Sequence, residues 1–156
     1  MPFPARLAVF REAVRHGREI RAVETFARPP TAEYRRPDFA RVATEPRGPV
    51  AAVTYTDGGV TLCADGSGRI TGIPEAVWGF AVSGFRVLPR WIESRVGLSA
   101  DLALVGELRD ICSRIAELID LFAAADRVLE AALRETLPRH ALGLDARGRE
   151  PDVESG

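Results

Sequence analysis

Arginines and aromatic rings are interleaved in the segment 72–97, and they are the side chains of this sequence best suited to chemistry. Arg86, Arg90 and Arg95 follow one another at spacings of four and five residues. Guanidinium groups so spaced along one helix could contact DNA phosphates or guanine edges. Arg69, in a neighbouring predicted strand, could join them. The equally simple interpretation is that these arginines only solvate the surface.

A second candidate group lies in the segment 28–48, which three proline-containing clusters mark as a loop. Within it, Tyr34 could stack on a nucleic-acid base while Arg35 and Arg36 hold phosphate groups. A solvated loop without a ligand is the alternative, and the residue types alone favour it.

The residue sets needed for catalysis or metal binding are missing from the sequence. His16 and His140 have no paired nucleophile, and Asp57 and Asp65 belong to predicted turns. The glycine-rich segment 57–68 lacks the Gly-Lys-Ser/Thr of a phosphate loop and the ligand pattern of a calcium loop. We therefore predict a chain that is not an enzyme and has no cofactor or metal site.

The composition is that of an ordinary globular domain. The chain has 156 residues, of which 46% are hydrophobic and 28% charged. No apolar stretch is long enough to cross a membrane, and the first residues lack a signal-peptide pattern. The two cysteines make no disulfide framework. These features predict a cytoplasmic protein that does not associate with membranes.

The charge is unevenly distributed along the chain. All 21 basic residues are arginine, and the net charge is −1. Residues 1–50 carry ten Arg against six Asp and Glu, whereas residues 99–156 carry seven against twelve. Any nucleic-acid surface must therefore be local, because the chain as a whole is not basic.

Hydrophobic periodicity in the first half predicts a helix followed by a small sheet. Residues 5–26 form an amphipathic helix, in which Gly17 is expected to mark close packing. Residues 49–71 alternate β-branched strands with glycine turns, which predicts a three-stranded antiparallel meander. The segment 74–80 suggests one short helical turn.

The second half, about 85–137, is predicted to be helical, which makes the fold class α+β. A helix over 85–95 has to begin near Leu88 or bend there, because Pro89 removes a backbone donor. Its side chains, together with the preceding aromatic residues, are expected to form the structural core around Trp78, Phe85 and Trp91.

A longer helix is predicted over residues 100–122, with Ser99 as its N-cap. The alanines at 123–125 permit a break before a last helix that ends near residue 137. We expect residues 1–137 to form a single domain and residues 138–156, rich in Arg, Gly, Asp and Glu, to be a disordered tail.

The segment 72–95 also carries a spaced pattern of conspicuous residues: Ile73, Pro74, Val77, Trp78, Val82, Gly84, Phe85, Leu88, Trp91, Ile92 and Arg95. It resembles the C-terminal specificity region of type ISP restriction-modification enzymes and related DNA methyltransferase and helicase polypeptides. That family has Val/Ile-Pro-x-x-Val-Trp, a short extended step, Gly-Gly-Tyr and a helix with Leu, Trp-Leu and Arg. The resemblance covers about residues 10–135. Ser83 and Phe85 depart from it, standing where Gly and Tyr are usual.

This resemblance implies a target-recognition module that binds double-stranded DNA for a methyltransferase or helicase-nuclease subunit. No Asn/Asp-Pro-Pro-Tyr/Phe or Walker motif occurs in the sequence, so we expect the module to stand alone or to be truncated. The alternative is a protein-protein interaction or structural module, whose helical half docks on such a partner or on a second copy. The DNA-binding candidates are Arg69, Arg86, Arg90, Arg95, Tyr34, Arg35 and Arg36.

Overall fold

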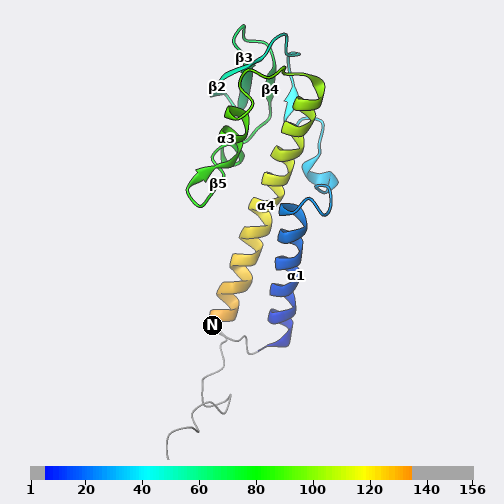
Figure 1. Cartoon of the computed structure of the whole chain (residues 1–156). Coiled ribbons are helices and arrows are strands. Elements are labelled where there is room, and N and C mark those ends of the chain that lie inside the picture. Colours follow the sequence, from blue (N-terminus) through cyan, green and yellow to red (C-terminus); the bar gives the residue numbers. More distant parts are fainter. Residues whose placement is uncertain (1–5, 135–156) are drawn as a thin grey trace, which may run out of the picture. The chain divides into compact units, whose positions relative to one another are not determined.

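The computed structural model describes residues 6–134 (Figure 1). The predicted tail at 138–156, and His140 within it, lie outside the described residues. By its internal contacts the chain divides into two compact units. One unit is Glu19–Phe122, and the other combines the chain up to Arg18 with the chain from Ala123.

The described elements confirm the predicted α+β class. Two of the helices, α1 and α4, run from one unit into the other. In chain order the elements are α1 (Leu7–Glu24), η1 (Ala32–Tyr34), β1 (Arg41–Val42), β2 (Val50–Thr56), β3 (Gly59–Cys63), β4 (Arg69–Thr71), α2 (Glu75–Trp78), β5 (Ala81–Val82), β6 (Phe85–Arg86), α3 (Val87–Glu93) and α4 (Leu102–Arg134).

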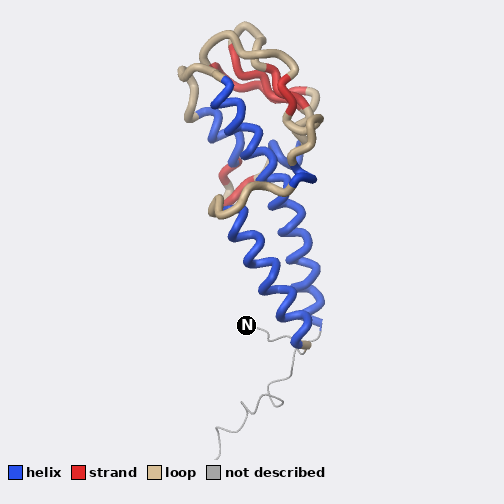
Figure 2. Tube along the Cα trace, turned by 90° about the vertical axis from the view of Figure 1, so that its right-hand side faces the viewer, coloured by secondary structure: helices blue, strands red, loops and turns tan. Residues whose placement is uncertain are grey.

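The main sheet has four antiparallel strands in the order β1-β4-β3-β2. Strands β2, β3 and β4 are the predicted meander. Strand β1 was not predicted, because it is only two residues long and forms by pairing Arg41 with Thr71 and Val42 with Ile70. Figure 2 shows this sheet in red, with the separate ribbon of β5 and β6 apart from it.

The core lies between the sheet, α3 and the first half of α4. Leu62, Ile70, Leu88, Ile92 and Leu108 are fully buried there. At about 25 cal/mol per Å² of apolar surface removed from water, these branched side chains supply much of the free energy that stabilises the unit.

Both tryptophans pack against this core, but Phe85 does not belong to it. Trp78 and Trp91 are partly buried, and Trp78 stacks on Tyr55 with ring centroids 4.9 Å apart. Phe85 is 59% exposed, so its predicted place in the core is wrong. The reason is local: Phe85 belongs to the exposed strand β6 rather than to the buried face of a helix.

The position of Pro89 explains why α3 is undistorted. The helix begins at Val87, so Pro89 is in its first turn, where backbone N–H groups have no intrahelical partner to lose. The predicted helix over 85–95 is therefore two residues shorter at each end.

Helix α4 differs from the prediction at its start and in its length. Asp101 caps it, because Asp101 Oδ1 accepts a hydrogen bond of 2.9 Å from the backbone N of Leu104. Ser99 instead forms a β-bridge with Pro49. The helix runs to Arg134 without the break expected at 123–125, since alanine is the strongest helix former.

In the unit that includes the end of α4, Val128 and Ala132 are buried. His16 of α1 is buried as well, and its Nδ1 has no hydrogen-bond partner among residues 6–134. A side chain at Gly17 would meet nothing within 4 Å, so the close packing predicted there is wrong. None of the helices in the described part has the length and apolar character to cross a membrane.

Candidate nucleic-acid interface

The side chain of Arg69 is hydrogen-bonded to neighbouring strands of the sheet. Its Nη2 donates to the backbone O of Thr56 at 2.7 Å, and its Nη1 donates to Thr56 Oγ1 and Thr61 Oγ1, each at 3.2 Å. These bonds join β4 to β2 and β3. A DNA contact by Arg69 would have to compete with them.

The side chain of Arg95 also has hydrogen-bond and ring partners within the protein. Its Nη1 donates to Trp91 O at 3.1 Å and to Ser94 Oγ at 2.8 Å. The guanidinium carbon lies 3.7 Å from the centroid of the Trp91 ring, and Nη2 lies 3.9 Å from Glu107 Oε2. Such a stacked and hydrogen-bonded guanidinium stabilises the end of α3.

Arg86 and Arg90 are exposed and lie over aromatic rings. The guanidinium carbon of Arg90 is 4.7 Å from the centroid of Phe85, and that of Arg86 is 6.0 Å from the centroid of Trp78. Neither side chain takes part in an ion pair with residues 6–134. Both are therefore available for an anionic ligand while the rings restrict their conformations.

The ribbon of β5 and β6 brings an apolar pair next to these arginines. Val82 lies directly opposite Phe85, so the two side chains share one face, and they are 55% and 59% exposed. The turn between them has positive φ at Ser83 (52°) and Gly84 (81°). Two consecutive positive φ angles are what a two-residue hairpin turn of type I′ requires.

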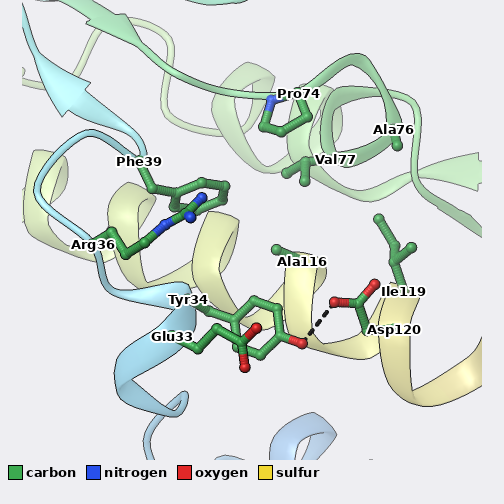
Figure 3. A pocket seen from close by; sticks show the side chains of 10 residues that line it. All are labelled: Glu33, Tyr34, Arg36, Phe39, Pro74, Ala76, Val77, Ala116, Ile119 and Asp120. Carbon is green, nitrogen blue, oxygen red and sulfur yellow. Dashed lines mark hydrogen bonds between the residues drawn. The ribbon is translucent and has the colours of Figure 1, made fainter. Parts of the chain in front are cut away.

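Tyr34, Arg36 and Phe39 line a cavity of about 300 Å³ against α2 and α4. Figure 3 shows Tyr34 pointing its hydroxyl at Asp120, to which it donates a hydrogen bond of 2.6 Å. Burial, and then this hydrogen bond, raise the pKa of Tyr34. Tyr34 is therefore part of the cavity wall, and its hydroxyl is bonded to α4.

A second cavity, also of about 300 Å³, lies between the η1 loop and α4. Three arginines line it, because Arg109 of α4 joins Arg35 and Arg36. The sequence analysis missed Arg109, since the helical periodicity only shows that it lies on the polar face of α4. Phe39, Gly106, Asp110 and Ser113 complete its lining.

The second cavity and the groove beside the β5–β6 ribbon lie against different faces of α4. The second cavity uses Gly106, Arg109 and Ser113 of α4. The groove of about 190 Å³ beside the β5–β6 ribbon uses Ile111 and Ile115 of α4. At 100° per residue these positions point in roughly opposite directions from the helix axis. Arg35 and Arg36 therefore lie on a different side of α4 from the groove.

The sequence model of the type ISP C-terminal specificity domain matches residues 1–117. The chain belongs to this family. The matched residues of this specificity domain include the sheet, the β5–β6 ribbon and the first part of α4, which confirms the resemblance seen in the segment 72–95. No curated protein and no solved structure matches the chain.

The family connects the chain with restriction-modification and target recognition. Specificity domains are in general non-catalytic. Among residues 6–134 of this one, no group of three or more His, Cys, Asp or Glu side chains could hold a metal ion.

A buried charged network positions the loop of this specificity domain that carries Arg35 and Arg36. Glu117 of α4, only 3% exposed, accepts a hydrogen bond of 2.6 Å from Arg28 Nη2 and one of 3.2 Å from the backbone N of Thr31. The bond to Glu117 is the main cause of the raised pKa of Arg28.

Arg114, one turn before Glu117, holds the other side of the same loop. Its Nη1 donates to Arg28 O at 2.9 Å and to Val23 O at 3.1 Å, and its guanidinium carbon lies 4.1 Å from the centroid of the Phe26 ring. Two charged residues of α4 thereby fix the path of the chain from the end of α1 to η1.

Proposed function

We propose that this chain is a target-recognition module that binds double-stranded DNA through the β5–β6 ribbon and the start of α3. The observation that carries the proposal is the match to the specificity-domain family over residues 1–117. The module itself does no chemistry. It serves a DNA methyltransferase or helicase-nuclease subunit of a restriction-modification system and acts in the cytoplasm, without a cofactor of its own.

The local geometry of the ribbon supports the proposed binding of DNA. A two-stranded β-ribbon fits the major groove of B-DNA. Val82 and Phe85 would make apolar contacts with base edges or thymine methyl groups, and Arg86 and Arg90 flank them with guanidinium groups suited to phosphates or guanine. Because the arginines already lie over rings, less side-chain entropy is lost when they bind.

Replacing Arg90 with alanine is expected to weaken duplex binding about tenfold and to lower the salt dependence of log K by about one unit, because one phosphate contact is lost. The measurement is fluorescence anisotropy of the full chain with a labelled mixed-sequence duplex, titrated at several salt concentrations. Selection from a randomised duplex pool would then give the preferred sequence.

Arg127→Ala is the matched control, since Arg127 is an exposed arginine of α4 outside the residues that match the family. It should bind within about twofold of the wild type. A wild-type chain that binds no duplex even at low salt contradicts the proposed function. Equal effects of Arg90→Ala and Arg127→Ala would remove the ribbon from the interface.

A second candidate function, docking on a partner protein, is favoured by exposed apolar residues in the other unit. Leu7 and Phe10 share one face of α1, and Leu129 and Leu133 share one face of α4; each is at least 50% exposed. If these faces form an interface between copies, light scattering should give a dimer that Leu129→Ser with Leu133→Ser returns to a monomer. A wild-type monomer at high concentration argues against self-association.

A further inference from the structure

We propose that the cavity between the η1 loop and α4 is a binding site for a phosphate group. Its positive wall is formed by Arg35, Arg36 and Arg109, which come from two segments more than 70 residues apart in the chain. Where the phosphate belongs to a DNA backbone, this inference rests on the proposed function; where it belongs to a free phosphate compound, it stands independently.

The charges around the cavity leave an excess of positive groups. Asp110 also lines it, but its Oδ2 accepts a hydrogen bond of 2.7 Å from Arg114 Nε, so its charge is already compensated. Arg36 lies 3.7 Å from Asp38, and both side chains are more than 60% exposed. Exposed pairs of this kind are weak, so Arg36 can turn toward a ligand at little cost.

Three guanidinium groups around one cavity suit a phosphate better than a carboxylate. Guanidinium forks donate parallel hydrogen bonds to pairs of phosphate oxygens, and such charge-assisted bonds are about twice as strong as neutral ones. Ser113, 5% exposed and part of the lining, offers a hydroxyl donor in addition.

Gly106 is the one residue of the cavity lining without a side chain. An alternative explanation would be that Gly106 makes room for a neighbouring side chain, but a Cβ at this position would meet nothing within 4 Å. Glycine also disfavours a helix interior. A ligand that approaches the helix at Gly106 would account for a glycine that packing does not require.

The size of the cavity limits what it can accept. About 300 Å³ is roughly ten times the share of liquid volume of one water molecule. The space admits a phosphate group with several waters but not a folded segment of another protein. Because the cavity and the β5–β6 ribbon use different faces of α4, a straight duplex on the ribbon does not by itself reach the cavity. Both sources of phosphate therefore have to be tested.

Two variants test the site by different means. Arg109→Gln removes one positive charge, whereas Gly106→Leu adds a side chain to the lining without changing the charge. The matched controls lie on the same helix: Arg127→Gln repeats the charge change, and Ala103→Leu adds a similar side chain at an exposed position outside the cavity. Leucine favours a helix over glycine, so the melting temperature of Gly106→Leu should not fall below that of the wild type.

In the first arm, the full chain is titrated with inorganic pyrophosphate by calorimetry. In the second, affinity for a mixed-sequence duplex is measured across salt concentrations. Arg109→Gln and Gly106→Leu should each weaken binding about tenfold, while the controls stay within twofold. If both variants bind the duplex more weakly, the site binds the DNA backbone. The slope of log K against log salt concentration should then be about one unit lower for Arg109→Gln. If both variants bind only pyrophosphate more weakly, the site binds a free phosphate compound.

Wild-type affinity of both variants for pyrophosphate and duplex would overturn the inference. A wild-type chain that binds pyrophosphate but no duplex would contradict the proposed function and leave the phosphate site standing. The two proposals therefore fail on different results.

Discussion

Replacing Gly72 with alanine is expected to lower the free energy of unfolding by about 3 kcal/mol. Gly72 follows β4 with φ of 74°, a conformation that costs an L-residue about 1–2 kcal/mol. In addition, a Cβ at this position would overlap the carbonyl oxygen of Asp38. Backbone cannot move aside as a flexible side chain can, so the segment before β1 would have to shift.

Gly66→Ala separates these two contributions. Gly66 has φ of 83°, close to that of Gly72, but a Cβ there would meet nothing within 4 Å. Both variants lose the same freedom in the unfolded chain. In urea denaturation, Gly66→Ala should therefore lose only about 1–2 kcal/mol. Equal losses for the two variants would show that the contact with Asp38 contributes nothing.

The position of Gly72 also matters for the candidate phosphate cavity. Its carbonyl oxygen accepts a hydrogen bond of 3.2 Å from the backbone N of Ala40, next to Phe39, which lines both cavities beside the η1 loop. The sheet edge thereby fixes the end of the segment that carries Arg35 and Arg36. A substitution of Gly72 should therefore weaken phosphate binding at the cavity as well as lower the free energy of unfolding.

Most of the fold could be predicted because its signals are local. Alternating β-branched residues and glycine turns located β2, β3 and β4, and the apolar stripe located α4. The errors have two causes, a tertiary contact in one case and the closure of a hairpin in the other. Strand β1 forms only by pairing with β4. Phe85 lies outside the core because two residues with positive φ close a hairpin before α3 and place Phe85 in its second strand.

The candidate site could be predicted only by residue type. Whether an arginine is available for a ligand depends on partners that are distant in the sequence: Arg69 is held by Thr56, and Arg95 approaches Glu107. Arg109 lies more than 70 residues after Arg36, and no sequence pattern links them. The buried network of Glu117 was missed for the same reason.

Replacing Glu117 with alanine is expected to lower the free energy of unfolding by about 3 kcal/mol. Glu117 is 3% exposed and satisfies both Arg28 Nη2 and the backbone N of Thr31. Its removal leaves the backbone N of Thr31 without this acceptor, and it leaves Arg28 Nη2 with only the more exposed Glu19 as a carboxylate partner. The cost lies at the lower end for a broken buried ion pair, because the side chain of Arg28 is 27% exposed and water can reach it.

Glu19→Ala is the matched control, because Glu19 Oε2 accepts a hydrogen bond of 2.8 Å from the same Nη2 of Arg28 but is 45% exposed. An exposed carboxylate of this kind contributes less than about 1 kcal/mol. The free energies of unfolding of both variants would be compared from the midpoints of urea denaturation, provided that the transitions have equal slopes. If Glu117→Ala cost no more than Glu19→Ala, the loop that carries Arg35 and Arg36 would have to be held by its other contacts with α4, which are the bond from Arg114 to Arg28 O and the bond from Tyr34 to Asp120.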